Sequence, residues 1–180
     1  ELSNEILFYT GGIGFSLNTF QPMNKEEFSP KLAVSTKALS SNIPEANRLI
    51  TEIMSQSKFD DRERIREIVQ ELKSRMEMII MNSGHQVASM RLLSYLSSIG
   101  TYHEITGGLE YYRFVSRLDT NFDNQFDSLK VILENIALSL FNKRNMVVGL
   151  VNENTEITHS RSNLKKFIST VPDNEFTVNP

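Results

Sequence analysis

The feature of this sequence that most constrains its fold is a long stretch with the hydrophobic period of an α-helix. Over residues 65–96 apolar side chains recur every three or four positions, as in Ile65, Ile68, Val69, Leu72, Met76, Ile79 and Ile80. Such spacing places them on one face of a helix. Asp60 and Glu63 have the spacing of a capping box, which predicts where the helix begins. We expect a bend at Gly84, because glycine costs about 1 kcal/mol relative to alanine within a helix.

Alternating apolar and polar residues predict two strands near the start of the chain. The alternation covers residues 13–18 and 32–37, and the longer run 5–20 is strand-like as a whole. Residues 21–30 contain two prolines and several charges, which is typical of a solvated connection. We therefore expect an antiparallel hairpin.

Further helices are predicted on both sides of the long one. Asn42 is the expected N-cap of the first, with Pro44 in its first turn and Glu45 returning the capping hydrogen bond. Gly107 and Gly108 interrupt the helical pattern, and a polar break covers residues 119–123. The predicted helices are 43–54, 109–118, 129–140 and a last one from Thr155 to just before Pro172.

Residues 146–151 form a continuous apolar run, which is typical of a buried central strand. We expect the helix face formed by Leu129, Ile132, Leu133 and Ile136 to cover this strand. The order of elements indicates an α+β fold, a small and largely antiparallel sheet covered by long helices. We expect one domain over residues 1–180, with a β-hairpin at 10–40, a helical block at 42–141, and a closing strand and helix at 145–172.

Composition excludes several classes of protein. The chain has 180 residues, a net charge of −3 and no cysteine, which excludes disulfides, thiolate metal sites and a cysteine nucleophile. No run of Lys and Arg offers a surface for nucleic acid. No apolar stretch reaches the roughly 20 residues of a membrane span, and residues 1–20 lack a signal-peptide pattern, so we favour a cytoplasmic location. The chain starts at Glu1 without Met, so we interpret it as a piece of a longer protein.

The three histidines, His85, His103 and His159, do not have the spacing of a metal site. His103-Glu104 begins the pattern H-E-x-x-H, but Gly107 stands where the second histidine is needed. The inverted order fails after His85, and nothing around His85 resembles a phosphoacceptor site. We expect surface or capping imidazoles, and no metal bound by this segment.

Other candidate motifs have structural explanations. The glycines of residues 11–14 precede a strand rather than a helix, which favours a backbone with φ > 0 over a phosphate site. Residues 111–113, Tyr-Tyr-Arg, are expected in a core or interface. The acidic pairs at 26–27 and 60–61 are expected to be solvated or to face a helix dipole. No G-x-S-x-G elbow is present, so the residues alone assemble no catalytic or substrate-binding site.

The chain resembles a known family over residues 9–172. The resemblance is carried by the phrases at 10–13, 32–39, 65–74, 84–85, 88–91, 94–95 and 107–112. Together they resemble the third, non-catalytic repeat of presequence proteases, a branch of the pitrilysin/insulinase zinc metallopeptidases. The resemblance implies a parent of several homologous α/β repeats in two halves that enclose unfolded peptides.

The resemblance also implies where the chemistry lies. Zinc is bound by H-x-x-E-H and a downstream Glu of the first repeat, and an Arg and a Tyr from the last repeat complete the site, so Tyr112 and Arg113 are not expected to have that role. We expect a non-catalytic part of the chamber wall whose partners are the other repeats. An alternative is a freestanding helical dimerisation domain that uses the stripe 65–96. If opening strands are missing, the hairpin edge is open and the piece is expected to self-associate.

Overall fold

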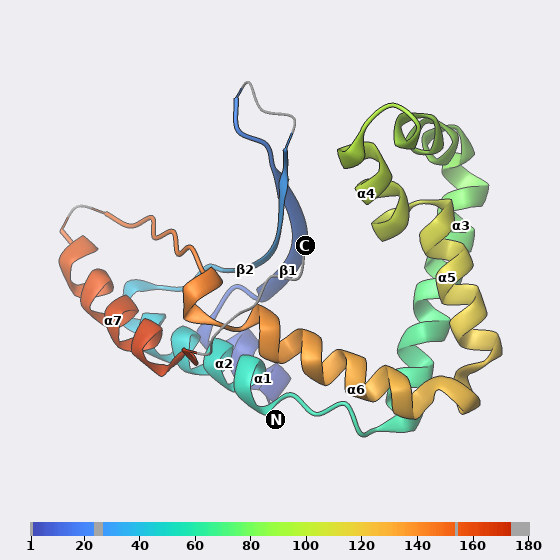
Figure 1. The fold of residues 1–180 in the computed structure, drawn as a ribbon. Coiled ribbons are helices and arrows are strands. Elements are labelled where there is room, and N and C mark those ends of the chain that lie inside the picture. Colours follow the sequence, from blue (N-terminus) through green and yellow to red (C-terminus); the bar gives the residue numbers. More distant parts are fainter. Residues whose placement is uncertain (1, 24–26, 154, 174–180) are drawn as a thin grey trace. The chain divides into compact units, whose positions relative to one another are not determined.

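The computed structural model describes residues 2–23, 27–153 and 155–173, and the chain divides into two compact units (Figure 1). Unit 1 combines residues from 1–21, 29–58 and 134–180. Unit 2 combines residues from 22–28 and 59–133. Each unit is described by itself below.

Unit 1 contains one β-hairpin and several helices. The hairpin consists of β1 (Ile13–Phe20) and β2 (Ser29–Thr36), and the helical elements are α1 (Leu2–Tyr9), η1 (Ser40–Asn42), α2 (Ile43–Gln56), the end of α6 (Phe122–Leu140), η2 (Lys143–Asn145) and α7 (Ile157–Thr170). Helix α2 packs against both α1 and α7. Its buried residues Ala46 and Leu49, together with Val171 after α7, are the apolar core of this unit.

The predicted hairpin is confirmed. Strands β1 and β2 are antiparallel, with a register that pairs Ile13 with Thr36 and Phe20 with Ser29. Gly12 enters β1 with φ of 107°, the left-handed backbone expected for this glycine run. The Thr36 hydroxyl donates a hydrogen bond of 2.9 Å to the carbonyl of Gly12, which fixes this entry to the end of β2.

The strand-like interpretation of residues 5–9 is wrong, because they belong to helix α1. Half-buried positions recur at 2, 5, 6 and 9, which is a helical period, and this period sets the face that α1 turns toward α2. An ion pair between Glu5 and Arg48 also joins the two helices. The short polar alternation within these residues carried less weight than the packing.

The predicted start of α2 is confirmed, but its capping box does not form. Asn42 is the N-cap and Pro44 lies in the first turn, yet the Asn42 side chain makes no capping hydrogen bond. Its amide instead donates to the carbonyl of Tyr9 at 3.3 Å. The carboxylate of Glu45 pairs with Arg48 at 2.7 Å. Both side chains therefore serve contacts other than the ones their spacing suggested.

Residues 146–151 are extended, but they do not form the predicted buried strand. The sheet of the described residues contains only β1 and β2. Val147 and Val151 are 92% and 99% exposed. The predicted covering helix face is open as well, since Ile132 and Ile136 are 53% and 47% exposed. A strand is defined by hydrogen bonds to a neighbour, and the described residues supply no neighbour to this run.

Unit 2 is built from α3 (Arg62–Ser94), α4 (Ser98–Gly107), α5 (Leu109–Thr120) and the first part of α6. Asp61 rather than Asp60 caps α3, and its carboxylate accepts a hydrogen bond of 3.0 Å from the backbone N–H of Arg64. The expected bend is one residue earlier than Gly84, because Ser83 has the non-helical angles φ −137° and ψ 36°. The break at Gly107-Gly108 is confirmed, whereas the polar break after α5 shrinks to Asn121.

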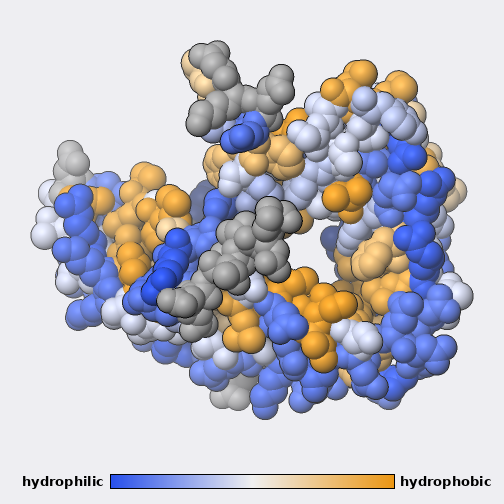
Figure 2. All heavy atoms as spheres, in the orientation of Figure 1, coloured by the Kyte–Doolittle hydropathy of each residue, from blue (hydrophilic) through white to orange (hydrophobic). Residues whose placement is uncertain are grey.

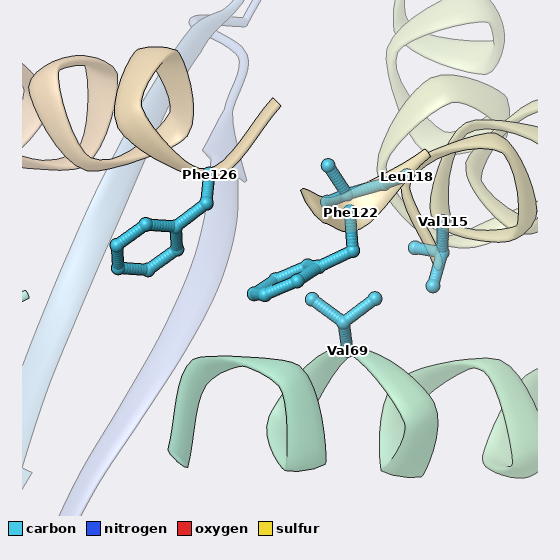
Figure 3. Close-up of a cluster of buried hydrophobic side chains, with 5 residues drawn as sticks. All are labelled: Val69, Val115, Leu118, Phe122 and Phe126. Carbon is cyan, nitrogen blue, oxygen red and sulfur yellow. The ribbon is translucent and has the colours of Figure 1, made fainter. Parts of the chain in front are cut away.

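The core of unit 2 joins three helices (Figure 3). Val69 of α3 points toward the ring of Phe122 at the start of α6, and α5 contributes Val115 and Leu118. The rings of Phe122 and Phe126 lie with centroids 5.7 Å apart. Phe122 is 1% exposed, so it is the most enclosed large side chain of this cluster. The α+β class is confirmed: helices dominate, and a small antiparallel hairpin accompanies them.

Candidate functional site

A shallow apolar hollow lies in unit 2 between the part of α3 that follows Ser83 and helix α4. Its lining residues are His85, Gln86, Ser89, Met90, Leu93, Gly100 and His103. The tight turn before α4 brings the two helices together, and the hydroxyl of Ser97 caps α4 by accepting from the N–H of Gly100 at 3.1 Å. A Cβ on Gly100 would lie 2.2 Å from the carbonyl oxygen of Leu93, so only glycine permits this approach.

The hollow unites two of the three histidines that the sequence singled out. His85 lies one residue after Gly84 on α3, and His103 lies on α4. Sequence spacing did not pair them, because they are far apart along the chain and meet only through the turn between the helices. His159 lies on α7 in the other unit, with an exposed side chain. The three histidines therefore do not form one site.

A cluster of charged side chains ties α3, α4 and the start of α5 together. Glu104 of α4 is 1% exposed, and its Oε1 accepts from Nη1 of Arg91 at 3.2 Å and from the backbone N–H of Glu110 at 3.3 Å. Arg91 also reaches the carboxylate of Glu110 at 3.1 Å. The second oxygen of Glu104 has no hydrogen-bond partner among the described residues. Gly108 makes room for it, since a Cβ there would lie 2.1 Å from that oxygen.

The charges of this cluster shift the acidity of its members. Burial raises the pKa of Glu110, but the hydrogen bond and charge of Arg113 and the charge of Arg91 outweigh it, so the pKa of Glu110 lies below its ordinary value. The pKa of Arg91 is raised, chiefly by its hydrogen bond to the hydroxyl of Tyr95 and, against desolvation, by its bond to Glu104. Glu110 and Arg91 are therefore held in their charged forms.

The described residues do not offer a fitting set of zinc ligands. A zinc site needs three or four side chains of His, Cys, Asp or Glu at one point, and no such group of three occurs in the part of the chain that the structure describes. His85 and His103 share the hollow with a glutamine, a serine and apolar side chains. We derive no metal chemistry for this hollow.

The other candidate residues have structural positions. Tyr111 packs against the core of unit 2, and the hydroxyl of Tyr112 donates to the carboxylate of Glu77 at 3.2 Å. Arg113 pairs with Glu110 at 2.7 Å. Of the acidic pairs, Asp61 is the cap of α3, and Glu26 lies outside the described residues. The predicted core or interface position of the Tyr-Tyr-Arg phrase is thus confirmed for Tyr111.

The arrangement around the hollow can hold an apolar group and offer hydrogen bonds from two imidazoles. The buried cluster below it fixes the angle between α3 and α4 through Arg91 and Glu104. Sequence reasoning missed Glu104 as a buried group, although its place four residues before Gly108 was a usable signal, because a glycine at a helix end often marks a close approach. These features describe a scaffold rather than an assembled catalytic centre.

Comparison with known proteins supports the family resemblance. The family described as associated with peptidase M16, subfamily C, matches residues 1–118. Protein HypA of Clostridium perfringens is 35% identical over 98% of this chain and 18% of its own length. Presequence protease 1, chloroplastic/mitochondrial, of Arabidopsis thaliana is 27% identical over 92% of this chain and 15% of its own. The mitochondrial presequence protease of Drosophila melanogaster is 28% identical over 96% and 16%.

These comparisons also bear on length, location and membership. The chain spans less than a fifth of the length of these three relatives. Among the described residues no helix has the length and apolar character that a membrane crossing requires. The names of the Arabidopsis and Drosophila relatives place those proteins in organelles, so the cytoplasmic expectation is not supported. The resemblance to presequence proteases is confirmed over most of the chain, which belongs to the family associated with peptidase M16, subfamily C.

Proposed function

We propose that this chain is a non-catalytic domain of a larger zinc metallopeptidase that degrades peptides, and that it forms part of the wall of the chamber that encloses them. The observation that carries the proposal is the match to this peptidase-associated family over residues 1–118, together with relatives that are named presequence proteases. In this proposal the parent binds zinc outside this segment, and unfolded peptides are substrates of the parent rather than of this domain.

Exposed apolar side chains support a role as one domain among several. Figure 2 shows hydrophobic side chains at the surface along α6, and half or more of the side chain is exposed at Val131, Ile132 and Leu138. The end of α3 adds Leu92, Leu93, Tyr95 and Leu96. Apolar groups in such number are typical of surfaces that contact other protein. We expect the other repeats of the same parent to be that protein.

A dimerising helical domain is the competing function, and the packing of α3 weakens it. Val69 and Met76 of the stripe are buried, and Ile65 and Leu72 pack against the core of unit 2. The first half of the stripe is therefore used within the chain, and a partner helix could reach only the remainder. A coiled coil needs a seam that continues over several heptads, and this seam is already occupied.

The experiment compares the 180-residue chain with the full-length parent protein. Both are incubated with zinc, dialysed, analysed for bound metal and assayed for cleavage of an unstructured peptide. We expect the parent to hold zinc and to cleave the peptide, with loss of activity after chelation. We expect the 180-residue chain to do neither. Variants His85→Ala and His103→Ala of the parent should keep zinc content and cleavage within about twofold of the unmodified protein.

Two results would contradict the proposal. One tightly held zinc per 180-residue chain, lost in the His103→Ala variant, would place a metal site in this domain. Cleavage of peptides by the 180-residue chain would show that the domain is catalytic. A His159→Ala variant is the matched control, because His159 is an exposed histidine in the other unit.

A further inference from the structure

Residues 146–151 already have the geometry of a β-strand on one side. The less exposed residues are Met146, Val148 and Leu150, and they alternate with Val147, Gly149 and Val151, which are exposed. A period of two is the pattern of a pleated strand with one face packed against its own domain. Figure 2 shows hydrophobic side chains at the surface over this segment.

The segment is held at both of its ends by side chains of unit 1. At the first end, Lys31 of β2 donates to the side-chain oxygen of Asn145 at 2.8 Å. At the second end, the side-chain amide of Asn152 donates to the hydroxyl of Ser160 at 2.7 Å and to that of Ser40 at 3.3 Å. Ser160 is fully buried. The position of the segment is therefore fixed by polar anchors rather than by a backbone ladder.

The anchors also set the direction of the segment. Lys31 comes before Ser40 in the chain, and their partners Asn145 and Asn152 follow in the same order. The segment thus runs parallel to β2. Within the described residues the backbone of 147–151 makes no hydrogen bond, and β2 pairs only with β1. The two parallel edges are therefore farther apart than the roughly 4.8 Å of adjacent strands.

We propose that a strand from outside this chain lies between β2 and residues 146–151 and pairs with both, which joins them into one sheet. A strand that runs antiparallel to two parallel neighbours can bond to each of them, and such a strand would extend the antiparallel hairpin by the same ladder. The unpaired N–H and C=O groups of Val147 to Val151 would then find partners. Unpaired edges of this kind are costly when apolar side chains surround them.

The occupant that fits is a strand of the same parent polypeptide. The Clostridium relative matches 98% of this chain with only 18% of its own length, so most of that protein lies outside the matched region. The residues at the segment are apolar on both faces, which is typical of a strand buried permanently rather than of one that binds passing substrate. This inference rests on the proposed function, because it needs the larger parent.

Hydrogen exchange read by mass spectrometry tests the proposal. We expect the amides of residues 147–151 to exchange at least about 100-fold more slowly in the full-length parent than in the 180-residue chain. The anchors should remain in both proteins, so the loop before Asn145 serves as an internal reference. Peptide cleavage by the parent is measured separately, so failure of the proposed function and failure of the strand are distinguishable.

Variants of the parent sharpen the test. Val148→Pro removes one N–H and should accelerate exchange across the segment, whereas Val148→Thr keeps the N–H and the β-branched shape and should leave the protection in place. If the proline variant does not fold, the comparison of the parent with the 180-residue chain still decides. Fast exchange in both proteins would overturn the proposal.

Three other patterns would also overturn it, each in favour of a different occupant. Slow exchange in the 180-residue chain at every concentration would mean that the segment pairs within its own chain. Protection of that chain only at high concentration would identify a second copy. Protection of the parent only after peptide is added would identify substrate.

Discussion

Arg91 and Glu104 form an ion pair in which Nη1 lies 3.2 Å from Oε1, and the carboxylate side of this pair is almost completely enclosed. Arg91 lies on the part of α3 that follows Ser83, and Glu104 lies on α4. The remaining oxygen of Glu104 has no partner among the described residues, so Arg91 is the only cation that neutralises this carboxylate there. The orientation of α4 on α3 therefore depends on one guanidinium group.

Replacement of this guanidinium should destabilise the chain strongly. Arg91→Ala leaves a buried carboxylate without its cation, and such a loss is several times larger than the loss of an exposed pair. Arg75→Ala is the matched control, because Arg75 pairs with Glu71 at 2.8 Å on the same helix while both side chains are about 60% exposed. Urea unfolding followed by circular dichroism compares them. Equal losses in the two variants would show that the buried pair has no special weight.

The close approach of α3 and α4 makes Gly100 sensitive to a single methyl group. Gly100→Ala places a Cβ 2.2 Å from a backbone carbonyl, which cannot rotate away, so we expect a loss of about 1–3 kcal/mol in the free energy of unfolding. Gly84→Ala is the control, since nothing lies within 4 Å of its Cβ, and helix propensity should give a gain of up to about 1 kcal/mol. The prediction fails if thermal unfolding shifts in the same direction in both variants.

Phe122 should be the most costly apolar residue to truncate in unit 2. It is almost completely buried between α3 and α5, so Phe122→Ala removes many contacts and leaves a cavity, with an expected loss of about 3–5 kcal/mol. Leu138→Ala on the same helix, where the side chain is 64% exposed, should change stability by less than about 0.5 kcal/mol. Denaturant titration of both variants checks the difference. A small loss at Phe122 would move the core elsewhere.

Asp123 should make stability depend on pH in the acid range. Hydrogen bonds from Arg66 first and Arg62 second lower the pKa of Asp123 below its ordinary 3.8. A lowered pKa in the folded state means that its contribution is complete above 3.8 and is lost as pH falls through the folded value. Asp123→Asn should therefore destabilise the chain at pH ~7 but not at pH ~2. A stability difference that stays constant between these two values would exclude this linkage.

The helices of unit 2 could be predicted from the sequence because their own residues build their core. The stripe that contains Val69 and Met76 meets α5 within the same chain, so local periodicity and packing agree. Even the bend in α3 was predicted to within one residue, since Ser83 precedes a glycine whose cost in a helix is general.

The run 146–151 could not be predicted in the same way, because a strand depends on a neighbour that its own sequence does not encode. Its apolar character correctly indicated a strand-like, extended segment, but the described residues supply no strand to cover it. The charged cluster was missed for a related reason. Arg91, Glu104 and Glu110 meet only after two turns of the chain bring three helices together, and no local pattern indicates such a meeting.

The interruption of α3 at Ser83 also affects which changes of length the domain can accept. In an unbroken helix, insertion of one residue rotates everything beyond it by about 100° and turns a buried face toward solvent. A residue with non-helical angles can absorb such a rotation, because the helical ladder is already broken there. We therefore expect insertions and deletions among relatives to collect around residues 83 and 84 and to be absent between residues 65 and 76.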